Sequence, residues 1–116
     1  MDFVGDHCDA IMDVLSKGKS GESYNISAGN EIDNITIIKK ILTIIGKSLE
    51  NIVFVEDRPG HDFRYSMDST KIRNTLGWSQ KINFEDGLAK TIDWYLKNKE
   101  WWKNLDQKIL DATPWK

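Results

Sequence analysis

The residues best suited to chemistry lie at positions 53–65, in the sequence VFVEDRPGHDFRY. This stretch holds two of the three arginines of the chain, one of its two histidines and one of its two prolines. An arginine presents a planar fork of N–H donors that matches phosphate oxygens. A Pro-Gly pair makes a tight turn whose backbone amides can approach an anion closely. The stretch therefore predicts a loop that binds an anionic, phosphate-bearing ligand.

Within this loop, Arg58 is the residue expected to contact the phosphate. His61 either donates to the same ligand or holds the loop in shape. Asp62 and Arg64 are expected to be structural partners, because arginines and aspartates commonly pair on protein surfaces. The alternative interpretation is a plain surface turn with an Arg–Asp pair and no ligand.

Two other patterns look like functional motifs but are better explained structurally. Tyr95 and Lys99 have a Tyr-x-x-x-Lys spacing, yet Tyr95 continues an apolar helical stripe and Lys99 falls in the last helical turn, where a cation suits the helix dipole. Residues 18–20 read Gly-Lys-Ser, but a phosphate-binding loop needs a glycine at position 13, which is Asp13. Since no glycine-rich dinucleotide motif follows a strand, we expect no cofactor-binding residues in this chain alone.

The composition is that of an ordinary globular domain, with 116 residues, 40% hydrophobic, 29% charged and a net charge of −2. The lysines are spread among acidic residues, which argues against a nucleic-acid-binding domain. No apolar run approaches the roughly 20 residues of a membrane-spanning helix, so we expect a cytoplasmic protein. Cys8 is the single cysteine, so neither an internal disulfide nor a metal site is expected, and it is interpreted as a small core residue.

Two helices are expected in the first half of the chain. One is capped by Asp6 and stops at Gly18, because four apolar residues share one helical face: Cys8, Ile11, Met12 and Leu15. The other is capped by Asn34 or Thr36 and stops at Gly46, and its apolar residues also have helical spacing: Ile38, Ile41, Leu42 and Ile45. The apolar faces of both helices are expected to be core.

Short strands are expected at residues 22–27, where polar and apolar side chains alternate, and at 52–55, an apolar run with β-branched residues. The second of these would deliver the polar loop. Phe3 and Val4 look like the last residues of a strand whose earlier part is missing, so we expect the chain to be a fragment of a longer protein.

Two further helices are expected after the loop. Asp68 would cap a short helix that stops at Gly77, with Trp78 following as a packing anchor. Asn83 and the residue three positions on resemble a capping box, and an apolar stripe follows to about residue 98: Phe84, Leu88, Ile92, Tyr95 and Leu96. The tail is expected to pack against another surface, inside or outside the chain, because it carries much apolar area: Trp101, Trp102, Leu105, Ile109 and Trp115.

The loop sequence VEDRPGHDFRY resembles the substrate loop of the dTDP-glucose 4,6-dehydratase family, extended short-chain dehydrogenases/reductases that act on nucleotide sugars. Phe63 departs from this pattern, where members often have a charged residue, and the departure puts little in doubt. Motifs similar to those of the family occur in the same order along nearly the whole chain, at residues 4–10, 21–26, 68–78 and 84–96.

The resemblance implies an α/β fold in which residues 1–116 are the C-terminal substrate-binding portion, with four or five helices and a few short strands. It implies a lyase that oxidises the sugar of dTDP-glucose at C4 with NAD, eliminates water across C5 and C6, and returns the hydride to C6. The catalytic residues and the NAD-binding domain would lie outside this chain, so the chain alone is expected to be inactive. The parent enzyme is expected to be a homodimer.

The resemblance also implies which residues contact the nucleotide diphosphate of the substrate, with Arg58 as the main phosphate partner: Asn25, Asp57, Arg58, Pro59, Gly60, His61 and Tyr65. Two alternatives remain open. The parent protein could be another nucleotide-sugar enzyme of the same superfamily, such as an epimerase or a decarboxylase. The chain could also be a stand-alone nucleotide-sugar-binding module.

Overall fold

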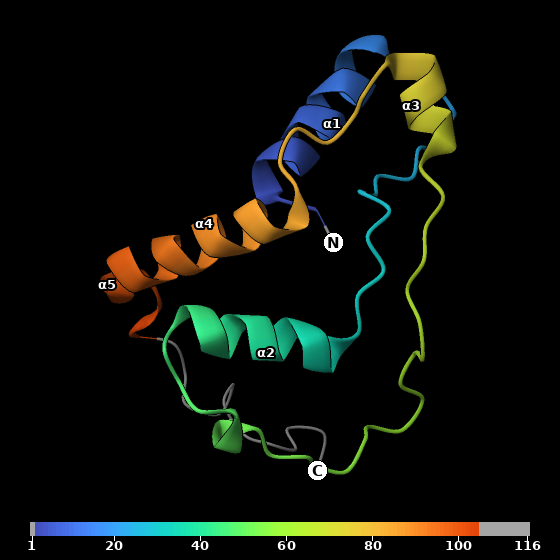
Figure 1. The fold of residues 1–116 in the computed structure, drawn as a ribbon. Helices are drawn as coiled ribbons and strands as arrows, with labels where there is room; N and C mark the ends of the chain where they lie inside the picture. Colours follow the sequence, from blue (N-terminus) through green and yellow to red (C-terminus); the bar gives the residue numbers. More distant parts are fainter. Residues whose placement is uncertain (1, 105–116) are drawn as a thin grey trace.

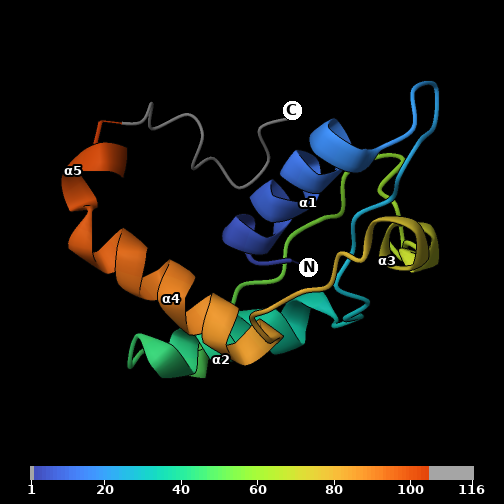
Figure 2. The same ribbon diagram turned by 90° about the horizontal axis from the view of Figure 1, so that it is seen from above.

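The computed structural model describes residues 2–104, which form five α-helices and one short 3₁₀ helix in an open arrangement (Figure 1). The elements are α1 (Val4–Lys17), α2 (Asn34–Ile44), η1 (Leu49–Asn51), α3 (Thr70–Leu76), α4 (Phe84–Lys97) and α5 (Lys99–Trp102). Helix α1 packs on α3, and α2 packs on α4. Seen from above, α4 lies over α2 (Figure 2). In this part of the chain, no helix has the length and apolar character needed to cross a membrane.

Helix α1 starts earlier than the sequence suggested. Val4 is already helical and Phe3 is the extended N-cap residue, so the expected strand at these two positions is wrong. The helix stops at Gly18, as expected, and the Gly18 N–H donates to the Val14 carbonyl at 2.8 Å.

Asp6 is not the cap of α1 but a cross-link to the segment before α4. Its carboxylate is buried and accepts hydrogen bonds from the backbone N–H groups of Lys81 and Ile82, at 3.1 and 3.0 Å. Its carbonyl accepts a hydrogen bond from Nε1 of Trp78 at 3.0 Å. Trp78 is 3% exposed, which confirms it as a packing anchor. A buried carboxylate satisfied by two amides fixes α1 against a part of the chain more than seventy residues away.

The face of α1 that is buried is not the one expected. Ala10 is completely buried with Ile72 of α3 and Trp78, because its small side chain lets α1 approach them closely. The residues expected to be core are exposed in the described structure: Cys8, Ile11, Met12 and Leu15. The side chain of Leu15 is 78% exposed. The helix was predicted correctly, but the partner that would cover its wider apolar face is not found within residues 2–104.

Helix α2 is capped by Asp33, not by Asn34 or Thr36. Oδ1 of Asp33 accepts a hydrogen bond from the Thr36 N–H at 2.7 Å, the geometry of an N-cap. The last turn is closed by Gly46, which has a positive φ of 66°, a backbone conformation that glycine adopts without a side-chain penalty.

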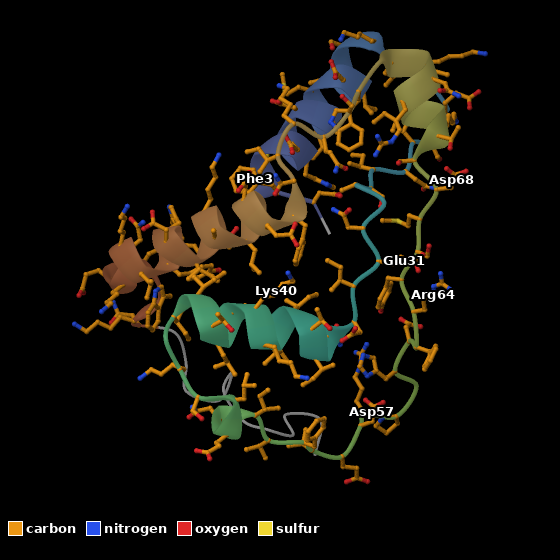
Figure 3. The ribbon with its side chains drawn as sticks, viewed as in Figure 1. Phe3, Glu31, Lys40, Asp57, Arg64 and Asp68 are labelled. Carbon is orange, nitrogen blue, oxygen red and sulfur yellow. The ribbon has the colours of Figure 1, made fainter. Side chains whose placement is uncertain are left out.

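Helix α4 has the N-cap that the sequence indicated, Asn83, whereas the N-cap residue of α3 is Ser69 and the expected cap, Asp68, lies one position earlier. Asp68 accepts hydrogen bonds from the N–H and the hydroxyl of Thr70, at 2.8 and 2.6 Å, and α3 ends at Gly77 in the left-handed region. Asn83 accepts from the Asp86 N–H at 2.8 Å and donates to the Asp86 carboxylate at 2.8 Å. A salt bridge of 3.1 Å between Lys40 and Glu85 then joins α2 to the first turn of α4 (Figure 3).

The strands expected at 22–27 and 52–55 do not form among residues 2–104, and both predictions are corrected. Part of the segment 22–27 lies beside the residues that precede α3, but the hydrogen bonds that join the two come from side chains. Nδ2 of Asn25 donates to the Asp68 carbonyl at 3.3 Å, and the Ser69 hydroxyl donates to the Ser27 carbonyl at 2.8 Å. A strand requires backbone N–H and C=O groups paired with a neighbouring strand, and this part of the chain offers none.

The described part of the C-terminal tail packs on α4. The Trp94 and Trp101 rings make an edge-to-face contact with centroids 5.2 Å apart, and Nε1 of Trp102 donates to the Tyr95 carbonyl at 3.0 Å. Trp101 nevertheless remains 67% exposed. The other apolar tail residues of the prediction lie outside the described residues: Leu105, Ile109 and Trp115.

Candidate functional site

Residues 57–61 form a tight exposed turn on the long segment between η1 and α3 (Figure 3, Asp57). The His61 N–H donates to the Arg58 carbonyl at 3.3 Å, which closes the turn. Gly60 has a φ of 69°, in the left-handed region, and a residue with a side chain would be strained there. The ring of Pro59 fixes the φ of Pro59 itself, so two adjacent residues, Pro59 and Gly60, set the shape of the turn.

Asp57 holds the histidine of the turn. Its Oδ1 lies 2.5 Å from Nδ1 of His61 and accepts the Arg58 N–H at 2.9 Å. The hydrogen bond from His61 lowers the pKa of the Asp57 carboxyl below its usual value, and the Arg58 N–H adds to this effect. The ionised carboxylate orients the imidazole through Nδ1, so Nε2 is the ring nitrogen that can meet a ligand.

Tyr65 belongs to the same group of side chains. Its hydroxyl donates to the Asp62 carboxylate, and this hydrogen bond is the main cause of a raised pKa of the Tyr65 phenol. The negative charge of Asp62 raises the pKa further, whereas the Arg58 guanidinium acts in the opposite direction. The Asp62 carboxylate, next to the turn in the chain, therefore holds the Tyr65 hydroxyl.

Arg64 is a structural residue, as its sequence context suggested, but its partner is Glu31. The Arg64 guanidinium and the Ser66 hydroxyl both donate to the Glu31 carboxylate (Figure 3). The hydrogen bond from Ser66 is the main cause of a lowered pKa of Glu31, followed by that from Arg64. Sequence reasoning missed Glu31 because its partners are 33 and 35 residues away, so no local pattern marks it.

Asn25 lies apart from the turn. Its side-chain amide donates to the carbonyl of Asp68, just before α3 and seven residues beyond the end of the turn. Six of the predicted binding residues thus lie on the loop, and the seventh, Asn25, lies on another segment, beside Asp68. A ligand that touches both must extend along the segment between them.

Two pockets of the described structure lie outside the turn at 57–61. One, of about 100 Å³, lies between residues 27–31 and residues 65–67 and is lined by Ser27, Gly29, Asn30, Glu31, Tyr65, Ser66 and Met67. A larger, open one of about 520 Å³ is lined by Asp2, Phe3, Val4, Lys90, Thr91, Trp94 and Tyr95. Residues 2–104 contain no cluster of three His, Cys, Asp or Glu side chains that could hold a metal ion.

The lowered pKa of Glu31 predicts a pH dependence. A depressed folded-state pKa means that the Glu31 contacts stabilise the chain fully above the ordinary value of 4.5 and lose this contribution as the pH falls through the folded-state pKa. A carbon-13 NMR titration of the Glu31 carboxyl should give a pKa below 4.5. Ser66→Ala should return that pKa toward 4.5; a normal Glu31 pKa in the unmodified chain would contradict the prediction.

The chain was compared with known protein families and curated proteins. Residues 1–91 match the family described as GDP-mannose 4,6 dehydratase. The chain is 48% identical to a dTDP-glucose 4,6-dehydratase of Streptomyces niveus over 88% of its own length, and 43% identical to one of Escherichia coli over 96%. It spans 30% and 33% of these two relatives, about a third of their length.

Solved structures agree with these matches. A dTDP-glucose 4,6-dehydratase of Bacillus anthracis in complex with NAD superposes with a TM-score of 0.83 at 47% identity, covering 89% of this chain and 32% of that one. DesIV of Streptomyces venezuelae, a dTDP-glucose 4,6-dehydratase with NAD and TYD bound, gives 0.84 at 41% identity, covering 88% and 32%. The resemblance noted in the sequence is confirmed: the chain belongs to the GDP-mannose 4,6 dehydratase family, and its relatives there are dTDP-glucose 4,6-dehydratases.

Proposed function

We propose that this chain is the C-terminal substrate-binding portion of a dTDP-glucose 4,6-dehydratase of α/β class, and that its loop binds the diphosphate of dTDP-glucose. The observation that carries the proposal is the turn at 57–61, which presents Arg58, a histidine oriented by Asp57 and a glycine in the left-handed region together. It occurs in a chain 48% identical to a protein of that name.

The roles of the loop residues follow from their chemistry. The Arg58 guanidinium would form charged hydrogen bonds with the diphosphate oxygens. Pro59 and Gly60 would hold the backbone close to the ligand, and Nε2 would donate to a further oxygen from the imidazolium form of His61, in which both ring nitrogens carry a proton. Residues 62–66, which lead from the turn toward α3, are called the return arm of the loop. Tyr65 on this arm would contribute its hydroxyl to the ligand after its hydrogen bond to Asp62 is broken.

Asn25 would contact the substrate from the neighbouring segment. One N–H of its side-chain amide already donates to the Asp68 carbonyl, at 3.3 Å. A side-chain amide has a second N–H and a carbonyl oxygen, so it can bind a ligand without losing this bond.

This chain does not fit an NAD site. Its sequence has no Gly-x-Gly-x-x-Gly motif. The Tyr95 ring packs edge-to-face on Trp94, and Lys99 begins the separate helix α5, so these two residues are not presented as a pair from one helix. The relatives solved with NAD support NAD as the cofactor of the parent enzyme. The missing motif supports our proposal that residues outside this chain bind it. We also propose that the parent enzyme is a cytoplasmic homodimer.

A second candidate is an enzyme acting on another nucleotide sugar, which the description of the matching family favours, since it names GDP-mannose. A competition experiment on the full-length protein distinguishes the candidates. Bound dTDP-glucose should be displaced by dTDP, and much less by UDP- or GDP-sugars. Preferential displacement by a GDP- or UDP-sugar would replace dTDP-glucose in the proposal.

The isolated 116-residue chain is predicted to show no dehydratase turnover with dTDP-glucose and added NAD, because the redox residues would lie elsewhere. The measurement is the appearance of the 4-keto product, with the full-length protein assayed in parallel as the positive control. Turnover by the isolated chain would show that catalytic residues lie within it.

A further inference from the structure

We propose that Glu31 is a positioning residue for the substrate loop, acting through Arg64 and Ser66 to set the side of the chain on which Tyr65 projects. The inference rests on the proposed function only in taking Tyr65 and the turn at 57–61 as substrate contacts. The fixing of the loop by Glu31 is independent of the ligand.

The pattern of contacts along the return arm of the loop is the first argument. Arg64 and Ser66 both donate to one carboxylate, that of Glu31, while Tyr65 between them donates to Asp62. In an extended chain, residues two apart share a side and the residue between them points to the other. Glu31 therefore holds two alternate side chains, while the hydroxyl of Tyr65 between them is held by Asp62.

The second argument is where Glu31 is held. It lies two positions before Asp33, which caps α2. Helix α2 in turn packs on α4. The carboxylate is thus attached to the helical body, whereas the exposed turn at 57–61 is shaped by hydrogen bonds between its own residues. A one-residue slip of the arm would bring Tyr65 to the Glu31 side and direct its neighbours away.

Glu22 provides a matched control, because it lies on the same segment between α1 and α2 as Glu31 and also forms an ion pair. Glu22 makes a 2.8 Å salt bridge with Lys71 of α3, and its side chain is about as exposed as that of Glu31, at 42% and 44%, although Lys71 is less exposed than Arg64. This pair also joins the first segment to a later part of the chain, but it does not touch the loop. Glu22→Gln therefore removes a comparable surface ion pair without affecting the return arm.

The first experiment is limited trypsin digestion of the full-length protein without substrate, followed by mass spectrometry of the bond between Arg64 and Tyr65. Glu31→Gln should speed cleavage at this bond, because an arm that is no longer held opens more often. Glu22→Gln should leave the rate unchanged. Equal rates in Glu31→Gln and the unmodified protein would overturn the proposal, as would equal acceleration by Glu22→Gln.

The second experiment measures steady-state kinetics with dTDP-glucose. Glu31→Gln should raise KM by about two- to five-fold, the range expected for an exposed ion pair, with kcat unchanged. Combining it with Tyr65→Phe should add less than the sum of the two single effects, because both act on the same contact. Loss of kcat together with thermal stability, or full additivity, would show a merely structural role and contradict the proposal.

The outcomes also separate this inference from the proposed function. If Arg58→Ala weakens dTDP-glucose binding and Glu31→Gln changes neither cleavage nor KM, the loop binds substrate but Glu31 does not position it. If Arg58→Ala has no effect on binding while Glu31→Gln still exposes the bond after Arg64, Glu31 holds the loop and the loop is not the diphosphate site.

Discussion

Replacing Arg58 with alanine should weaken binding of dTDP-glucose to the full-length protein by about 1.5 to 3 kcal/mol, the contribution of hydrogen bonds to a charged group. This corresponds to roughly a ten- to 150-fold higher Kd. The side chain is exposed on a turn whose shape is set by its neighbours, so its removal should leave the fold intact. Isothermal titration calorimetry measures the change directly.

Three companion variants test the specificity of that effect. Arg58→Lys keeps the positive charge but loses the planar fork, so it should recover only part of the affinity. Arg64→Ala removes an arginine from the same loop, but one engaged with Glu31, and should cost much less. Asn25→Ala should also cost less than Arg58→Ala. An unchanged Kd in Arg58→Ala would rule out the phosphate assignment.

Replacing Trp78 with alanine should lower the free energy of unfolding by about 3 to 5 kcal/mol, the range for truncating a buried aromatic residue. Its indole packs with Ala10 and Ile72 and donates to the Asp6 carbonyl, so it joins α1 to α3 and to the segment before α4. Since small domains have only about 5 to 15 kcal/mol of stability, this is a large fraction of the total. Urea unfolding followed by far-UV circular dichroism measures it.

Trp101 provides the control for this prediction. It is also a tryptophan that touches another aromatic ring, but it is 67% exposed. Trp101→Ala should therefore lower the free energy of unfolding by about 1 kcal/mol or less. Equal effects of the two substitutions would mean that the cluster around Trp78 is not the core of the chain.

Helix positions were predictable from sequence because the signals that start and stop a helix are local. Gly77 ends α3 with its positive φ, and Asn83 caps α4 through a residue three positions away. Where several capping residues stand together the prediction missed by one to three positions, as with Asp33 in place of Asn34 or Thr36. A cap is chosen by backbone geometry among neighbours of similar chemistry.

The errors occurred where the outcome depends on a distant partner. The expected strand at 22–27 stays unpaired because strand formation needs another strand, which residues 2–104 do not supply. The apolar stripe of α1 was recognised correctly as a helical pattern, but Ala10 and not Leu15 faces Trp78. Periodicity tells which residues share a face, and it does not tell which face another element covers.

The sequence by itself determined the chemistry of the loop, since Arg58, Gly60 and His61 are adjacent and their turn needs no distant residue to be recognised. Only the tertiary structure revealed that Glu31 holds the return arm, and that Asn25 lies apart from the turn. The physical reason is the range of the interactions. Turn and cap preferences act over a few residues, whereas the contacts that position the loop join groups more than thirty residues apart, which only the folded chain brings together.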